Sequence, residues 1–533
     1  MFAPLTTKRP MRQQIARSDT LTSPVGGWNA RDSIALMKPS DATMLDNWFC
    51  MPSELRVRLG SAYHVTAIGA QVESLMQWQS GSSTKMFAAA GTSFYDVSSA
   101  GAVGAAVQSG LTNARWQSVN YQLAGTNWLI CVNGADKPRY TSDGTTWVAV
   151  DGVSVPAITG VTTTNLSNVC IHQKRLWFVE KASLRCWYLD AEAVGGLAKV
   201  YDFGPLFNLG GYITAISTIT IDAGSGSDDH LVVLTSEGQV AWYAGTDPAS
   251  SSTWRLVGVY TIGQPLGPAG TALGARALTQ YAGDLLIITK DGLIPASKGL
   301  QSNRVSTQIA FTYKIQSAIS QATTDYGTSF GWQCVIFPSE NMLILNVPVG
   351  TDAQEQYVMN TISGAWSRFT GWGANCWIVW NDELYYGGNG IVYKAWTSHK
   401  DQATASTYNN IEAEAQQAFS DFGSTGVQKQ FRMVRPTLRI DNSVAVSVAL
   451  NTDYSGDAVS SLLSVSSTAA SVFDTAVFDT AVFASDELYI ARPYQDVSGV
   501  SDVGGTRLKV ATNLSDVRWV STTVTYETGN RAP

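Results

Sequence analysis

Short apolar strands separated by glycine turns dominate the middle of the chain. From about residue 70 to 400, the sequence repeats a unit of two apolar strands, a turn and an aromatic strand, as in NWLICVNGADKPRYTSDGTTWVAV and YAGDLLIITKDGLIPAS. The turns contain Asp143-Gly144, Glu237-Gly238 and Asp291-Gly292. These dipeptides predict hairpins, because glycine adopts a positive φ without steric cost.

The spacing of these units predicts a β-propeller. They recur about every 40 to 60 residues, and several short strands per unit at such a period are typical of propeller blades. One blade cannot bury both of its faces, so neighbouring blades must stack around an axis. We count six or seven units. The last unit is short, and we expect a strand near Leu55–Leu59 to complete it from the N-terminal side.

The sequence therefore predicts an all-β chain with three parts. Residues 1–61 form an N-terminal arm and the closing strand, residues 62–404 form the propeller, and residues 405–533 form a β-rich, sandwich-like domain. The arm contains a predicted short helix, Ala42–Trp48, capped by Ser40 or Asp41.

Two further segments depart from the repeat. Residues 306–327 are predicted to be a helical insertion, because Ile309, Ile315 and Ile319 have the spacing of an amphipathic helix. The five-residue repeat in VFDTAVFDTAVF, from Val472, is interpreted as a loop or an ornament at a sheet edge.

Composition and charge narrow the classes of function. Charged residues make up 14% of the chain, and the net charge is −7. This negative net charge argues against tight nucleic-acid binding, which needs clustered Lys and Arg. The first residues are basic but have no apolar stretch behind them, and no run of about 18 apolar residues follows, so neither a secretory signal nor a membrane helix is expected. The six cysteines are widely spaced and are expected to be buried, reduced thiols.

Candidate chemistry is sparse. The four histidines have no metal-ligand spacing, and His172 with Cys170 is better explained as a pair on one strand face. Asp228 and Asp229 in GSGSDDH lack the alternating pattern of a calcium loop. The segment TSDGTTW, residues 141–147, resembles the Asp-box of sialidase-type propellers, which is a folding element. No pair of carboxylates suited to glycoside hydrolysis is evident. We therefore expect no enzyme, no cofactor and no metal.

Aromatic residues allow a rival interpretation. Six of them, if exposed, could stack on sugars as in a lectin, although packing between blades explains them more simply: Trp242, Tyr243, Trp377, Trp380, Tyr385 and Tyr386.

The segment GGWNARDSIALMKPSDATMLDNWF, followed by LRVRLGS, is the most specific feature of the sequence. It resembles the N-terminal signature of the tail nozzle proteins (tail tubular protein B-like) of short-tailed bacteriophages. The phrases GDLLIITKDGLIPAS and LNTDYSG are also similar to parts of those proteins. The signature positions are Gly26, Gly27, Trp28, Asn29, Asp46, Asn47, Arg56, Arg58 and Gly60.

The resemblance implies a structural protein of the virion tail, assembled in the host cytoplasm. Six copies would form a ring below the portal and adaptor, extend the DNA ejection channel, retain the genome and dock tail fibres or spikes. DNA would pass without specific binding, since a ring of acidic subunits repels phosphates. A basic arm would dock on the adaptor or on a neighbouring subunit through Lys8, Arg9, Arg12 and Arg17. Two alternatives stay open: a propeller that binds or cleaves glycans, and a receptor-binding or baseplate component of a longer phage tail.

Overall fold

A computed structural model describes residues 16–222, 227–270, 276–299, 307–350, 353–459, 462–465 and 488–528. The chain divides into two compact units, Arg58–Ile411 and a second unit made of Met1–Val57 with Glu412–Pro533. The expected division treated residues 1–61 and 405–533 as separate parts. The structure instead joins N-terminal and C-terminal strands in one unit, because they pair with each other.

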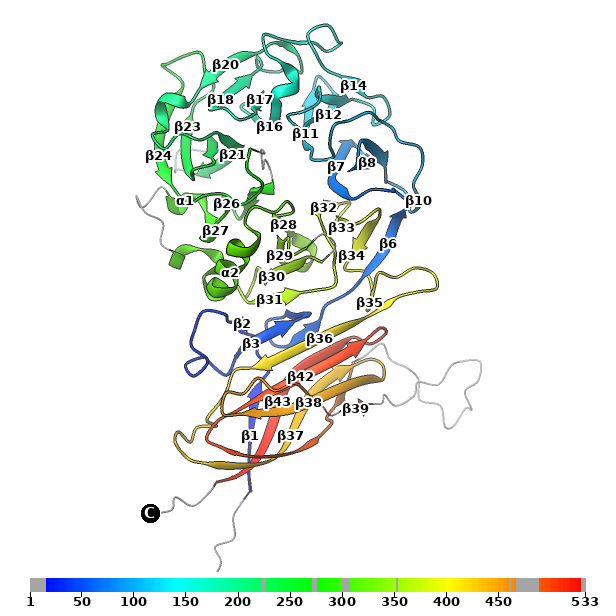
Figure 1. The fold of residues 1–533 in the computed structure, drawn as a ribbon, viewed down its shortest axis with the longest axis vertical. Helices are drawn as coiled ribbons and strands as arrows, with labels where there is room; N and C mark the ends of the chain where they lie inside the picture. The colour runs from blue at the N-terminus through cyan, green and yellow to red at the C-terminus, as the bar shows by residue number, and fades with distance from the viewer. Residues whose placement is uncertain are drawn as a thin grey trace, which may run out of the picture. The chain divides into compact units, whose positions relative to one another are not determined.

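The unit Arg58–Ile411 contains seven sheets of three or more strands among its described residues (Figure 1). The first three are β7 (Val72–Ser80), β8 (Ser83–Ala90) and β9 (Ser93–Asp96); β11 (Gln117–Leu123), β12 (Thr126–Val132), β13 (Arg139–Thr141) and β14 (Val148–Ala149); and β16 (Leu166–His172), β17 (Arg175–Glu180), β18 (Arg185–Tyr188) and β20 (Lys199–Asp202). The next three are β21 (Ile213–Asp222), β22 (Ser227–Thr235), β23 (Gln239–Ala244) and β24 (Arg255–Thr261); β25 (Leu278–Tyr281), β26 (Asp284–Thr289) and β27 (Gly292–Pro295); and β28 (Gln333–Phe337), β29 (Met342–Val347), β30 (Glu355–Asn360) and β31 (Trp366–Phe369). The seventh combines β32 (Cys376–Trp380), β33 (Glu383–Gly387) and β34 (Val392–Ala395) with β6 (Ser61–Thr66) and β10 (Gly101–Ala102).

These seven sheets are the blades of a closed propeller. The first strand of each sheet contacts the first strand of the next, in the order β7, β11, β16, β21, β25, β28 and β32, and β32 contacts β7 again. Figure 1 shows the blades arranged around this ring of inner strands. The expected all-β propeller is therefore confirmed, with seven blades.

The ring is closed by a strand from the N-terminal side of the unit. Strand β6 pairs antiparallel with β34, with Tyr63 opposite Tyr393 and Val65 opposite Val392. The expected closing strand, Leu55–Leu59, is not the one that does this. Its residues Leu55–Val57 form β5, which pairs with β4 (Trp48–Cys50) and β43 (Val517–Thr528) in the other unit. Leu55 and Val57 are fully buried there, so that pairing satisfies their apolar faces.

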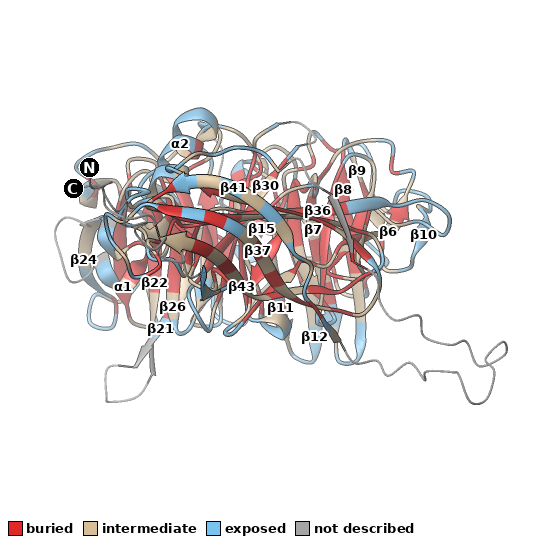
Figure 2. Cartoon of the chain, turned by 90° about the horizontal axis from the view of Figure 1, so that it is seen from below, coloured by how far each residue is buried: buried red, intermediate tan, exposed pale blue. Residues whose placement is uncertain are grey.

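Aromatic side chains fill the spaces between blades. Trp177 of the third blade stacks on Trp254 of the fourth at 5.7 Å between ring centroids, and Trp254 also stacks on Tyr243 at 5.2 Å. The six aromatic residues considered as exposed are all buried, and the largest exposed fraction among them is 7%, at Trp380. Figure 2 shows buried residues along the strands and exposed residues on the loops. Blade packing therefore accounts for these rings.

Short connecting elements complete this unit. In the stretch expected to be helical, the described residues form 3₁₀ turns at Thr307–Ile309 and Phe311–Ile315 and the helix α2 (Gln316–Tyr326), with Ile315 and Ile319 buried. The remaining elements are α1 (Ala296–Gly299), 3₁₀ turns at Thr163–Asn165, Gly204–Leu206 and Pro338–Glu340, and the strands β15 (Ile158–Thr159), β19 (Gly196–Leu197) and β35 (Lys400–Asp401).

The second unit is built from two β-sheets. One contains β4, β5, β43, β37 (Lys429–Ile440), β40 (Tyr489–Ala491), β1 (Ala16–Thr22) and β41 (Gln495–Ser501). The other contains β2 (Gly27–Trp28), β3 (Asp41–Asp46), β36 (Asn409–Gln417), β42 (Gly504–Thr512), β38 (Val444–Thr452) and β39 (Leu462–Val465). The two sheets approach closely where a Cβ on Gly504 of β42 would lie 3.0 Å from Phe431 of β37. This packing makes the unit sandwich-like.

The predicted helix Ala42–Trp48 is wrong. Residues 41–46 form strand β3, in which Ala42 pairs with Trp28 of β2 and Leu45 pairs with Ala415 of β36. Ala42 and Leu45 are fully buried. Burial between partner strands therefore overrides the local capping signal at Ser40 and Asp41.

All six cysteines are buried and none is in a disulfide, which confirms the expectation for them. Burial raises the pKa of the Cys376 thiol to about 11, so this thiol stays protonated near neutral pH. In the described parts of the chain, no helix is long and apolar enough to span a membrane.

We predict that His172 makes the protein sensitive to acid. The imidazole is 2% exposed between the third and fourth blades, where its Nδ1 lies 3.1 Å from Thr218 Oγ1. Burial lowers its pKa to about 4 from the ordinary 6.5. Below pH 6.5 the unfolded chain binds the proton more readily, so stability is lost as the pH falls from 6.5 towards 4, by up to about 3 kcal/mol. Urea unfolding across this range should show a weaker pH dependence for His172→Gln than for the wild type. Equal pH dependence in the wild type and His172→Gln would refute this assignment.

Candidate functional site

The first signature residues form a tight polar corner before β3. Asn29 is 1% exposed, and its Nδ2 donates to Asp32 Oδ2 at 2.9 Å and to Asp41 Oδ2 at 3.0 Å. Gly27 begins β2, and a Cβ on Gly26 would lie 2.3 Å from Asp41 Oδ1. The corner therefore needs a glycine at 26 and an amide at 29.

Asp46 and Asn47 lie where β3 ends. Asp46 is opposite Glu414 in the pairing of β3 with β36. Asn47 has a left-handed backbone (φ 59°), and its Nδ2 donates to the carbonyl of Glu412 at 2.7 Å. Asparagine tolerates this conformation better than most residues, so the side chain both permits the turn and anchors it.

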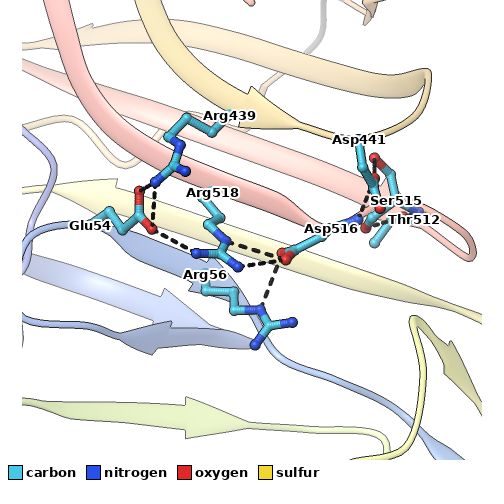
Figure 3. A network of polar contacts seen from close by, with 8 residues as sticks. All are labelled: Glu54, Arg56, Arg439, Asp441, Thr512, Ser515, Asp516 and Arg518. Carbon is cyan, nitrogen blue, oxygen red and sulfur yellow. Dashed lines mark hydrogen bonds and ion pairs between the residues drawn. The ribbon is translucent and has the colours of Figure 1, made fainter. Parts of the chain in front are cut away.

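Arg56 belongs to a network of charged residues in the sandwich-like unit (Figure 3). Its Nε lies 3.1 Å from Asp516 Oδ1, and Arg518 contacts the same carboxylate at 3.0 Å. Glu54 accepts hydrogen bonds from Arg439 at 3.1 Å and from Arg518 at 3.0 Å. Glu54 and Asp516 are buried, so their charges depend on these arginines.

A turn between β42 and β43 positions Asp516 of the same network. Asp441 accepts from Ser515 Oγ at 2.9 Å and from the backbone N–H of Asp516 at 2.8 Å. Thr512 Oγ1 accepts from the Ser515 N–H at 2.9 Å. The residues of this network lie in or directly beside β5, β37, β42 and β43, so Arg56 has an architectural role.

Arg58 is fully buried at the start of the propeller unit. Its guanidinium contacts Asp401 at 2.9 and 2.5 Å, donates to the Thr370 carbonyl at 2.6 Å, and lies 4.6 Å from the Trp372 ring centroid. A Cβ on Gly60 would lie 1.8 Å from the Lys400 carbonyl oxygen, so only glycine fits beside this pair. The expected strand Leu55–Leu59 includes Arg58, but in the structure Arg58 follows β5 and is buried.

The basic arm is only partly described. Arg17 is exposed on β1, opposite Tyr526 of β43. Lys8, Arg9 and Arg12 lie outside the described residues, as does the repeat VFDTAVFDTAVF.

The acidic segments have structural contacts among the described residues. Asp228 and Asp229 are part of β22, and Asp229 accepts a hydrogen bond from Thr220. Asp143 accepts from the N–H groups of Thr145 and Thr146, at 2.7 Å each, so it shapes its turn. Among the residues that the structure describes, no group of three or more His, Cys, Asp and Glu side chains has the arrangement of a metal site.

A polar pocket opens at one face of the propeller. Its volume is about 240 Å³, and it is lined by Glu73, Asn113, Arg115, Asn133, Ser167, Lys181 and Gly270. Glu73 and Ser167 begin inner strands, whereas Asn133 and Lys181 directly follow the second strands of two blades. Because neighbouring strands are antiparallel, these starts and ends share one face of the ring. Loops at the mouths of closed β-structures commonly form ligand sites.

Two arginines next to the pocket pack on the ring of Phe330. The Cζ atoms of Arg115 and Arg276 lie 4.3 and 4.4 Å from the Phe330 ring centroid. Arg276 is buried and donates to the Glu73 carbonyl, to Ser74 Oγ at 3.1 Å and to the Asn375 carbonyl at 3.4 Å. Burial lowers its pKa, but an arginine keeps its charge at neutral pH. Arg276 thus links the blades that begin at β7, β25 and β32.

The pocket carries more positive than negative charge on its lining. Arg115 Nε pairs with Glu73 Oε1 at 3.1 Å, and Glu73 is the one carboxylate among the described lining residues. Lys181 is exposed and has no ion-pair partner in the described part of the chain. Asn113 accepts the Arg115 N–H through Oδ1 at 2.9 Å, which leaves its amide nitrogen as a donor.

Sequence reasoning missed this pocket entirely. Its residues come from separate blades and share no motif. Arg115 and Arg276 each stand two residues before the inner strand of a blade, but nothing in the sequence around them marks a site.

No family model matches the chain, and no curated protein matches it. Solved structures to which the chain is similar include an exo-β-1,3-galactanase from Phanerochaete chrysosporium, at 10% identity and a TM-score of 0.24, covering 76% of this chain and 95% of that one. A glycoside hydrolase family 43 arabinoxylan arabinofuranohydrolase from Bacillus subtilis has 10% identity and a TM-score of 0.26, covering 89% and 96%. YCF48 bound to D1 peptide has 10% identity and a TM-score of 0.35, covering 71% and 100%.

The expectation that the chain is not an enzyme is corrected by these structures. Two of them are glycoside hydrolases, so the missing sequence motif is no ground for excluding catalysis in this fold. Likenesses at such low identity and TM-score concern the fold alone and assign no substrate to this chain.

We predict that Arg58 is worth far more to stability than an exposed arginine in the same unit. Arg58→Met leaves the Asp401 carboxylate buried without its cation, which should cost about 3–5 kcal/mol. Arg185→Met is the matched control, because Arg185 pairs with Glu180 at the surface and should contribute less than about 1 kcal/mol. Urea unfolding followed by tryptophan fluorescence measures both. Equal midpoints for the two variants would contradict the assigned role of Arg58.

Proposed function

We propose that the chain is the structural subunit of the nozzle ring of a short phage tail. The observation that carries this proposal is that the signature residues hold the strands and turns of the fold in place. Asn29, Asn47, Arg56 and Arg58 each anchor a strand or a turn, and Gly26 and Gly60 fit where a side chain would collide. A signature devoted to architecture supports a protein that works by assembling.

Charge is consistent with a conduit for DNA. One chain has a net charge of −7, so a ring of six would carry six times that, −42. Such a ring repels phosphate groups, which favours passage of DNA over binding. Under this proposal the ring lies below the portal and adaptor, retains the genome and docks fibres or spikes.

The basic arm supplies the contact with the adaptor in this proposal. Residues 1–15 precede β1, and β1 itself is held along its whole length by β43. Removing residues 1–15 therefore tests the arm without removing a strand of the sheet.

The first test is assembly on the cognate portal and adaptor complex, viewed by negative-stain electron microscopy. We expect the full chain to add a sixfold ring with an open axial channel. A chain without residues 1–15 should fold but attach at least about ten-fold more weakly, because charge-assisted contacts are lost. A chain with Lys8, Arg9 and Arg12 changed to Gln separates loss of charge from loss of length.

The outcomes of this test are distinct. Full attachment of the shortened chain would contradict the role of the arm and leave the ring intact. A threefold assembly would favour a baseplate or receptor-binding component. A chain that never joins the adaptor would overturn the nozzle proposal.

A second candidate function is glycan binding at the propeller mouth. The pocket supports it, because its amide and charged side chains supply the hydrogen-bond donors that hydroxyl-rich ligands require. We expect selective signals on a glycan array, and a loss of at least about ten-fold for Asn113→Ala if that amide contacts the ligand. Asn442→Ala, in the other unit, is the control. An array without any signal above background would contradict this function.

A further inference from the structure

We propose that the pocket at the propeller mouth binds a small saccharide that carries a carboxylate, such as a uronic acid. This inference deepens the glycan-binding candidate and rests on it, and it is independent of the nozzle proposal. It follows from the charges around the pocket, from the donors left without acceptors, and from the size of the cavity.

The charges around the pocket do not cancel. Glu73 is neutralised by Arg115 at 3.1 Å. Asp136 lies beside the pocket, where it accepts from Asn133 Nδ2 at 2.7 Å and from Thr112 Oγ1 at 2.8 Å. Against these two carboxylates stand three cations: Arg115, Lys181 and Arg276. The group therefore has an excess of one positive charge in a chain whose net charge is negative.

Within the described residues, Arg276 makes no hydrogen bond to a carboxylate that would balance its positive charge. Its hydrogen bonds go to two carbonyls and one hydroxyl, which are neutral. It also shares the Phe330 ring with Arg115, so two guanidinium groups lie close together. An anion bound above Arg115 would lower the repulsion between them.

Donors on the lining are arranged for an acceptor-rich ligand. Lys181 Nζ is a cation with no carboxylate partner among the described residues, and it stands on a different blade from Arg115. The Asn113 amide nitrogen is a third donor, since its Oδ1 is already occupied by the Arg115 N–H. A carboxylate suits the cations, and ring hydroxyls suit the amide and Glu73.

The size of the cavity limits the ligand. Its volume of about 240 Å³ lies below the roughly 300–1,000 Å³ of typical ligand pockets. A single sugar ring or the end of a chain is therefore favoured over an oligosaccharide lying across the face.

Calorimetric titration of the full chain with glucuronate, glucose and acetate tests the inference. We expect glucuronate to bind at least about ten-fold more tightly than either of the others, because only it engages both the cations and the amide. Lys181→Gln should weaken glucuronate binding about ten-fold and leave the weak binding of glucose unchanged. Lys199→Gln is the matched control, because Lys199 belongs to the same blade and pairs with Asp190 outside the pocket.

Each remaining outcome is decisive. Equal binding of glucose and glucuronate would overturn the requirement for a carboxylate while the glycan-binding function stands. Acetate binding as tightly as glucuronate would overturn the saccharide. A chain that binds none of the three at millimolar concentration, but still signals on the glycan array, would refute this inference without refuting the function it rests on.

Discussion

The pairing of β6 with β34 is the constraint on which the propeller depends. Seven sheets can bury their faces only if the ring closes, since an open ring leaves the first and last blades each with one apolar face in water. Closure by antiparallel hydrogen bonds between Ser61–Thr66 and Val392–Ala395 fixes the two ends of this unit to each other. The buried pair of Arg58 and Asp401 lies just outside that strand pair in the sequence, one residue at each end of the unit. Strand pairing and charge pairing thus secure the same closure.

A closed ring leaves polar groups near its axis that need hydrogen-bond partners. Inner strands converge there, and their loops bring backbone carbonyls and polar side chains together without strand partners. Arg276 satisfies three such acceptors from two other blades, and Phe330 covers the flat face of its guanidinium. Arginine suits this position because its planar group combines several donors with stacking. The cost is a buried positive charge next to the mouth of the propeller.

Much of the fold could be predicted from the sequence, and the failures have local causes. Alternation and Asp-Gly turns depend on neighbouring residues, so the blades were visible. The segment around Ala42 failed because Ser40 and Asp41 resemble a helix cap, whereas burial against β2 and β36 decides the outcome. The short last unit correctly predicts a closing strand from the N-terminal side, but SAYHVT and not Leu55–Leu59 closes the ring, because Leu55 and Val57 are buried in the other unit. The pocket had no sequence signal of this kind, since only the stacking of neighbouring blades brings Glu73, Arg115 and Lys181 together.

Three arginines show how one residue type acquires different roles from its surroundings. Both terminal nitrogens of Arg58 donate to the Asp401 carboxylate, which therefore neutralises the charge of Arg58 within the fold. Arg56 and Arg518 both pair with Asp516. This pairing joins strands through a network in which most charges have an opposite partner. Among the described residues, Arg276 donates to neutral acceptors, and the nearby Glu73 carboxylate already pairs with Arg115. The partners of an arginine, and not its presence alone, therefore separate a structural residue from one that can prepare a binding surface, and this difference supports the proposed anion site at the propeller mouth.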